Sequence, residues 1–159
     1  MTDRRYVAVV GASAATSEEL ALAEEVGREL ARAGAVLVCG GLGGGMNAAA
    51  RGCEAEGGTS IGVLPGVSRA GASPHLTLAI PTGMGEARNA LIARVGDAVI
   101  AIGGEFGTLS EIALGLKMGK RVVGLGTWNL DREGMPGDPI IRADSPREAV
   151  GAAIGPRNP

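Results

Sequence analysis

The sequence has very few aromatic residues: one Phe, one Trp and one Tyr occur among its 159 residues, and its formal net charge is −2. Protein surfaces that bind nucleic acids usually carry a stripe of basic side chains or several aromatic rings on which bases stack. This composition favours neither arrangement. We therefore expect no nucleic acid among the partners of the protein.

Histidine and cysteine are also scarce, because His75, Cys39 and Cys53 are the only such residues in the sequence. The two cysteines lack the CxxC spacing of zinc and redox sites, so we interpret them as small buried residues. One histidine cannot supply the cluster of ligands that a zinc ion requires. The turn at residues 11–13 lacks the GxGxxG spacing of NAD sites. The sequence thus predicts no bound metal ion and no cofactor.

Long hydrophobic runs are missing as well. No stretch is long enough to span a bilayer, and the N-terminus, residues 1–5, leads directly into a predicted strand rather than into the apolar core of a signal peptide. We expect a cytoplasmic protein that has no contact with a membrane. The length fits a single domain that covers residues 1–159.

Glycine is the residue that the sequence has in excess, with 28 copies that stand at the ends of predicted elements. Short apolar runs alternate with segments of helical periodicity, which predicts an α/β fold: a single-domain, Rossmann-like, doubly wound parallel sheet flanked by helices. The predicted strands are residues 6–10, 35–39, 60–64, 76–80, 98–102 and 121–125, with a weak strand near 140–141. The predicted helices begin near residues 16, 46, 84, 108 and 144.

The stretch from Ala98 to Glu111 has the layout of a phosphate site. A buried strand is followed by a glycine-rich turn with Gly103, Gly104 and Gly107, and a helix is expected to begin near Thr108. Glycines allow the backbone to approach a ligand, and a helix N-terminus offers free N–H groups and a positive dipole end to an anion. Residues 108–111 also fit a capping box, in which Thr108 caps the helix and Glu111 folds back onto it. Both interpretations are open at this level.

Two other turns follow predicted strands, and in a parallel sheet they reach the same edge as the phosphate-type turn. Small residues follow the first strand, and five glycines occupy six positions after the second. Close approach to a ligand is the favoured explanation, and tight packing of a helix on a strand is the alternative. We therefore predict a small anionic ligand with a nucleotide-like phosphate. The residues that these two turns contribute to the predicted site are Gly11, Ser13, Gly41, Gly43, Gly44 and Gly45.

Trp128 follows the last regular strand, at the same edge of the predicted sheet. It is the one large aromatic residue placed to stack on a base or a sugar. A role in covering the core or a subunit contact is the favoured interpretation.

Residues 84–94, the pair 97–98 and the turn 103–111 resemble the Lonely Guy (LOG) family, long mislabelled "lysine decarboxylase". The similarity is greatest to its short, DprA-related bacterial branch, which is similar to molybdenum cofactor carrier proteins. The LOG signature is an Arg-Lys pair followed by PGGxGTxxE. Five positions match it, namely Arg88, Gly104, Gly107, Thr108 and Glu111. Three positions depart from it, namely Asn89 for the lysine, Gly103 for the proline and Glu105 for the second glycine.

The resemblance implies a phosphoribohydrolase, which cleaves the N-glycosidic bond of a nucleoside 5′-monophosphate. By resemblance, Gly107 and Thr108 hold the phosphate, while Arg88 and Glu111 are the catalytic residues at the ribose. A carboxylate can stabilise oxocarbenium charge or orient water, and a guanidinium can hold hydroxyls or phosphate. The resemblance also implies a homodimer or larger homo-oligomer. Lysine decarboxylase activity is not expected, because Lys117 lies at a helix end, where it compensates the dipole.

Two alternatives remain beside the hydrolase. The departures at Asn89, Gly103 and Glu105 favour a non-catalytic binder or carrier of a phosphorylated ligand such as a pterin phosphate or molybdenum cofactor. Two of them, at Asn89 and Glu105, weaken anion binding, because one removes a positive charge and the other adds a negative charge. The other alternative is an interaction or sensor module that keeps the fold without a working pocket.

Overall fold

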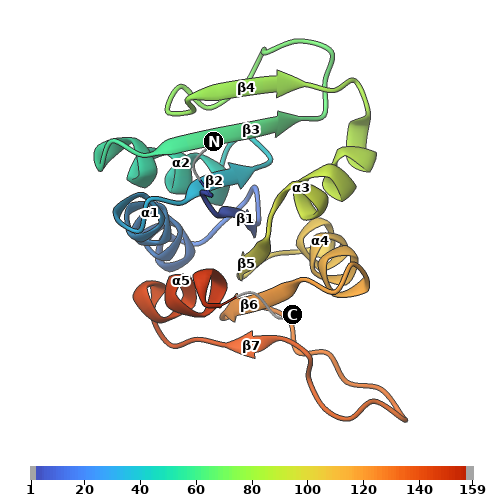
Figure 1. The fold of residues 1–159 in the computed structure, drawn as a ribbon. Helices are drawn as coiled ribbons and strands as arrows, with labels where there is room; N and C mark the ends of the chain where they lie inside the picture. The colour runs from blue at the N-terminus through green and yellow to red at the C-terminus, as the bar shows by residue number, and fades with distance from the viewer. Residues whose placement is uncertain (1–2, 157–159) are drawn as a thin grey trace.

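The computed structural model describes residues 3–156, which form a seven-stranded parallel sheet with helices on both faces (Figure 1). The strand order is β4-β3-β2-β1-β5-β6-β7. The strands are β1 (Tyr6–Gly11), β2 (Val36–Cys39), β3 (Thr59–Leu64), β4 (Leu78–Pro81), β5 (Ala98–Ile102), β6 (Arg121–Leu125) and β7 (Ile141–Arg142). The helices are α1 (Ser17–Arg32), α2 (Gly45–Ala55), the 3-10 helix η1 (Gly85–Arg88), α3 (Asn89–Val95), α4 (Phe106–Lys117) and α5 (Pro146–Ile154).

This architecture confirms the predicted α/β class and the doubly wound parallel sheet. The chain alternates between strand and helix along most of its length, and all six strand pairings are parallel. The fourth strand begins at Leu78, two residues later than predicted, and the segment before α3 is a 3-10 turn rather than the start of a regular helix.

The core has two layers, one on each face of the sheet. Strand β5 is buried along its whole length, as expected for a central parallel strand. Ala98, Ile100 and Ile102 pack toward α1, α2 and α5, while Val99 and Ala101 pack toward α3 and α4. Figure 1 shows these two groups of helices on opposite sides of the sheet.

Helices α1 and α2 pack tightly because glycines face the partner helix. A Cβ atom on Gly27 would overlap the carbonyl oxygen of Ala49, and a Cβ atom on Gly52 would overlap that of Glu24. Helix α1 begins close to the predicted position, with a capping box in which Thr16 Oγ1 accepts from the Glu19 backbone N–H at 3.2 Å. The small residues thus serve helix-on-helix contact on this face of the sheet.

The start of α4 differs from the prediction. The helix begins at Phe106 with Glu105 as its N-cap, so Thr108 lies inside the first turn and the capping box at residues 108–111 is wrong. Gly103 and Gly104 have φ values of +52° and +100°, which bends the chain immediately after β5 and starts the helix early. Gly104 also leaves room for the Thr108 side chain, which a Cβ atom at Gly104 would overlap.

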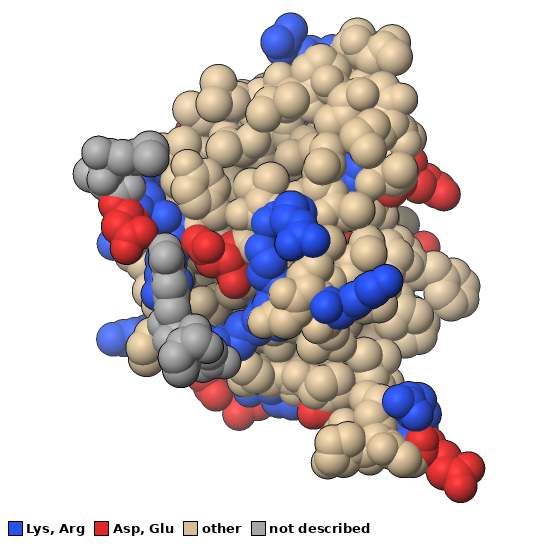
Figure 2. Space-filling model, turned by 45° about the vertical axis from the view of Figure 1, so that its right-hand side comes forward, with Lys and Arg blue, Asp and Glu red and all other residues tan. Residues whose placement is uncertain are grey.

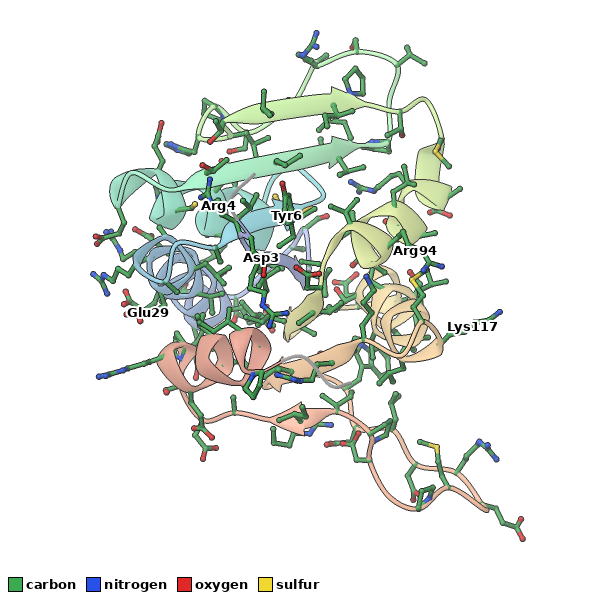
Figure 3. The ribbon with its side chains drawn as sticks, in the orientation of Figure 1. Asp3, Arg4, Tyr6, Glu29, Arg94 and Lys117 are labelled. Carbon is green, nitrogen blue, oxygen red and sulfur yellow. The ribbon has the colours of Figure 1, made fainter. Side chains whose placement is uncertain are left out.

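Asp97 joins the start of β5 to the start of β1, because its Oδ2 accepts from the Tyr6 backbone N–H at 2.9 Å. Arg94 lies on α3, and Lys117 points outward from the end of α4 (Figure 3). Neither cationic side chain reaches the carboxyl edge of the sheet.

Strand β4 forms one edge of the sheet and exposes apolar side chains. Leu78 is 55% exposed and Ile80 is 48% exposed. In the space-filling view, the upper part of the molecule, where β3 and β4 lie, carries few charged side chains (Figure 2). An unpaired edge of this kind is suited to contact with another chain.

Candidate functional site

Strands β1 and β5 are neighbours in the sheet, and the chain leaves them toward opposite faces. Helix α1 follows β1 on one face and α4 follows β5 on the other. Such a point of reversal creates a crevice at the carboxyl ends of the strands, where ligands bind in open α/β sheets. A cavity of about 150 Å³ lies there. It is lined by Val9, Val10, Gly11, Ala12, Ser13, Gly40, Met46, Arg88, Asn89, Glu105, Gly107, Thr108 and Glu111.

Arg88 enters the cavity from the end of η1 and is held by backbone carbonyls. Its Nη1 donates to the Gly40 and Val63 carbonyl oxygens, both at 2.6 Å, and its Nε donates to Asn89 Oδ1 at 3.0 Å. Burial lowers the pKa of Arg88, and the nearby Glu111 partly offsets this effect. Among the described residues, no hydrogen bond uses Nη2. The guanidinium is therefore fixed on one side and can donate to a ligand on the other.

Glu111 lies on the second turn of α4 and is only 8% exposed. Burial raises the pKa of this carboxyl to about 7, although the charge of Arg88 acts in the opposite direction. Within residues 3–156, its carboxyl group forms no hydrogen bond or ion pair. Near neutral pH it is thus present in both protonation states, as a general acid or base requires.

The N-terminus of α4 supplies the anion-binding part of the cavity. Gly107 and Thr108 line it, and the N–H groups of the first helical turn have no carbonyl partner within the helix. Asn89 Nδ2 donates to Ser110 Oγ at 3.2 Å, and Ser110 Oγ donates to the Gly107 carbonyl at 2.6 Å. These bonds join the Arg88 segment to the first turn of α4.

Glu105, the N-cap residue of α4, also lines the cavity. Its carboxylate is a negative charge at a helix N-terminus, where it interacts favourably with the dipole and competes with a bound anion. The departure from the LOG pattern at this position therefore acts directly at the predicted phosphate site.

The structure brings together some of the residues predicted to bind the ligand and separates others. Gly11, Ser13, Gly107 and Thr108 line the cavity together with Arg88 and Glu111. Six of the glycines predicted to bind the ligand do not line the cavity, namely Gly41, Gly43, Gly44, Gly45, Gly103 and Gly104.

Protein contacts account for several of the glycines outside the lining. A Cβ atom on Gly44 would overlap the Ser13 carbonyl oxygen, and a Cβ atom on Gly103 would overlap the Glu19 carboxylate. Tight packing, the alternative in the sequence analysis, thus accounts for these positions. Contact of these glycines with a ligand stays a prediction.

Sequence reasoning missed the structural role of Asn89. It was noted only as a lost lysine, whereas its side-chain amide bonds both Arg88 and Ser110. Its position directly after Arg88 is the signal that could have indicated this. Met46 and Ala12 were also missed, since apolar lining residues carry no motif.

Trp128 lies in the loop after β6 and packs on another ring. Its centroid is 5.8 Å from that of Phe106, and its Nε1 donates to the Glu105 carbonyl at 3.2 Å. The contact with Phe106 anchors the start of α4 to the loop after β6.

Residues 3–156 contain no group of three or more His, Cys, Asp or Glu side chains arranged to hold a metal ion. In the same part of the chain, no helix is long and apolar enough to cross a bilayer.

The sequence profile of the SLOG cluster4 family matches residues 4–150. The chain belongs to this family. The resemblance to the LOG superfamily is thereby confirmed. An uncharacterized protein of Archaeoglobus fulgidus is 42% identical over 119 residues, which are 75% of this chain and 78% of that protein.

Two solved structures share the family fold over almost their whole length. The molybdenum cofactor binding protein from Rippkaea orientalis is 33% identical, with a TM-score of 0.86 over 94% of this chain and 95% of that one. The molybdenum cofactor carrier protein from Chlamydomonas reinhardtii is also 33% identical, with a TM-score of 0.82 over the same shares of the two chains. The family branch predicted from the sequence is therefore supported by structure.

A more distant likeness extends to DNA processing protein A from Streptococcus pneumoniae. It is 18% identical, with a TM-score of 0.71 over 93% of this chain and 61% of that one. At this identity the likeness shows a common fold, which agrees with the DprA kinship of the branch.

Proposed function

We propose that this family member is a binder and carrier of a small phosphorylated ligand of the molybdenum cofactor type, a pterin phosphate. The observation that carries the proposal is the match, over 94% of the chain, to two proteins named for molybdenum cofactor. The main sequence hypothesis, hydrolysis, thus gives way to its alternative.

The cavity supports the same ligand chemistry. A phosphate fits at the first turn of α4, where Gly107 and Thr108 offer backbone N–H groups and Arg88 offers its free Nη2. Glu105 and the absence of the family lysine at Asn89 weaken the binding of a dianion. A carrier benefits from moderate affinity, because it has to release its cargo.

The test is native purification from a bacterial host that makes molybdenum cofactor. Bound molybdenum is measured by mass spectrometry, and bound pterin by fluorescence after oxidation of the denatured protein. We expect bound molybdenum and bound pterin in the wild-type protein. We expect much less of each in Arg88→Lys, which keeps the positive charge but loses the planar guanidinium with its parallel N–H donors. Arg132→Lys, in the loop after β6, is the matched control. A wild-type protein that is free of pterin and also fails to bind pterin phosphate in vitro contradicts the carrier function.

We propose hydrolysis of a nucleoside 5′-monophosphate as the second candidate, because Glu111 favours it. A buried carboxyl with a pKa of about 7, beside a phosphate site and an arginine, suits the stabilisation of oxocarbenium charge or the activation of water. The test is release of free base from AMP and GMP by the wild-type protein and by Glu111→Gln. Release by the wild-type protein alone supports catalysis, and no release from either nucleotide rules it out for these substrates.

Three further elements belong to the proposal. We infer a cytoplasmic protein that assembles as a homodimer or larger homo-oligomer, with the exposed Leu78 and Ile80 of β4 as support for contact between copies. We also infer no nucleic acid partner, because the net charge is −2 and the aromatic residues are few. Analytical ultracentrifugation of wild-type protein and Ile80→Lys tests the assembly.

A further inference from the structure

A groove opens beside the cavity, between the segment 85–95 and α4. Its volume is about 550 Å³, larger than that of the cavity. Asn89 and Gly107 line both hollows, so the groove continues from the predicted phosphate site. The other lining residues are Glu86, Ala87, Ala90, Phe106, Ser110 and Leu114. A ligand with its phosphate at α4 therefore has room to extend along this groove.

One wall of the groove carries an aromatic ring that is held in place. Phe106 is the first residue of α4 and is 79% exposed, yet its ring lies 5.8 Å from that of Trp128, centroid to centroid. The only Phe and the only Trp of the sequence, 22 positions apart, thus pack against each other. A flat heteroaromatic ring gains affinity by stacking on an exposed aromatic face such as that of Phe106, with little sequence or substituent preference.

The other wall carries a carboxylate without a partner. Glu86 lies on η1 and is exposed, and its carboxylate takes part in no hydrogen bond or ion pair among the described residues. Two carboxylate oxygens accept two parallel N–H bonds, as they do from the fork of an arginine. A ring edge that presents a ring N–H beside an exocyclic amino group has the same donor pattern. Adenine lacks that pattern, because its ring nitrogen N1 is an acceptor.

We infer that this groove is a ring subsite selective for a 2-amino-4-oxopyrimidine edge, the edge shared by pterins and guanine. Phe106 is the stacking surface and Glu86 is the residue that determines specificity. The inference rests on the proposed phosphate site, because the groove matters only as the continuation of that cavity. It adds a preference that the phosphate site alone does not supply.

Isothermal titration of the full chain with four ligands tests the inference. The ligands are GMP, AMP, 6-hydroxymethylpterin phosphate and ribose 5-phosphate. We expect GMP to bind about tenfold more tightly than AMP, since a bidentate pair discriminates between bases by about this factor or more. Glu86→Gln abolishes this preference, because it weakens the binding of GMP and leaves the binding of AMP unchanged. Glu133→Gln, an exposed carboxylate in the loop between β6 and β7, leaves the preference unchanged.

Phe106→Ala weakens GMP and AMP alike by about tenfold, while Phe106→Tyr keeps the ring and the affinity. Ribose 5-phosphate binds equally to all these variants, because it does not reach the groove. The relative affinity of the pterin phosphate and GMP then identifies which source of the shared edge the site prefers.

Equal binding of GMP and AMP by the wild-type protein, together with binding of ribose 5-phosphate, would overturn the ring subsite and leave the phosphate site standing. A preference for GMP that survives in Glu86→Gln would overturn the role of that residue. Failure of all four ligands to bind would overturn the phosphate site and, with it, this inference.

Discussion

Arg88 and Asn89 are neighbours in the chain and are also bonded through their side chains, because Arg88 Nε donates to Asn89 Oδ1 at 3.0 Å. The same amide donates to Ser110 on α4. The residue that replaces the family lysine thus removes a positive charge from the site and fixes the arginine that remains. Compared with a site that carries the lysine, this site attracts an anion less strongly but holds Arg88 in a fixed orientation.

Asn89→Ala is expected to weaken binding of a phosphorylated ligand such as GMP about fivefold. The reason is that Arg88 loses one of its fixed acceptors, which is worth about 1 kcal/mol for a typical hydrogen bond. Titration calorimetry measures the change, with Asn129→Ala, an exposed asparagine in the loop after β6, as the matched control. Unchanged affinity in Asn89→Ala would show that the two backbone carbonyls alone position Arg88.

Glu111→Gln is expected to stabilise the protein at high pH and to have little effect at low pH. The pKa of Glu111 is raised from 4.5 to about 7, so the folded state binds more protons than the unfolded state between these values. Stability therefore falls as pH rises through this window, and ionisation above it costs the wild-type protein about 3 kcal/mol. The glutamine side chain of the variant does not ionise, so the variant has no such loss of stability.

Denaturant unfolding at several pH values between 4 and 9 checks this prediction. The difference in the free energy of unfolding between Glu111→Gln and wild type should increase with pH and level off near pH 8. Glu133→Gln, which is exposed, should show no such trend. A difference that is independent of pH would mean that Glu111 ionises at an ordinary pKa in the folded protein.

Glu105→Gln is expected to raise the affinity for ribose 5-phosphate about three- to tenfold at low salt. Removal of the carboxylate relieves its repulsion of the phosphate, and added salt screens this effect. The same change costs about 0.3–1 kcal/mol of stability, because the negative charge at the N-cap favours the α4 dipole. Titrations at low and high salt, with thermal unfolding alongside, measure both quantities. Weaker binding in Glu105→Gln would indicate that Glu105 contacts a donor group of the ligand.

Gly27→Ala is expected to destabilise the protein by about 1–3 kcal/mol, although alanine is the better helix former. The added methyl group would overlap the backbone of α2, and a backbone carbonyl cannot move aside as a flexible side chain can. Gly151→Ala in α5 is the matched control, because nothing lies within 4 Å of its added Cβ atom. This control should stabilise the protein by about 0.5–1 kcal/mol. Equal effects of the two changes would contradict the close α1–α2 contact.

The order of strands and helices could be read from the sequence because it depends on local patterns. Residues 98–102 and 121–125 form strands over the predicted ranges, since a short apolar run between turn residues is typical of a central strand. The start of α1, predicted near residue 16, is set by Thr16 and Glu19 and is local for a similar reason. A capping box joins residues three positions apart and needs no partner from elsewhere in the chain.

The same rule failed at Thr108 and Glu111, where the spacing is equal but the outcome is different. The positive φ values of Gly103 and Gly104 start α4 early, and the turn is then held by Thr127, whose hydroxyl donates to the Gly103 carbonyl at 2.5 Å. This contact comes from the loop after β6, the strand that neighbours β5, and no local pattern shows it. Glu111 is consequently a buried cavity carboxyl instead of a cap.

The sequence by itself determined the α/β alternation, the family and the residue types at the carboxyl edge of the sheet. These depend on periodicity and on motifs, which lie within one segment of chain. The tertiary structure decided which of those residues share the cavity, raised the pKa of Glu111 and joined Phe106 to Trp128. Burial, electrostatic environment and ring contact depend on segments distant in sequence, and only the packed fold brings these together.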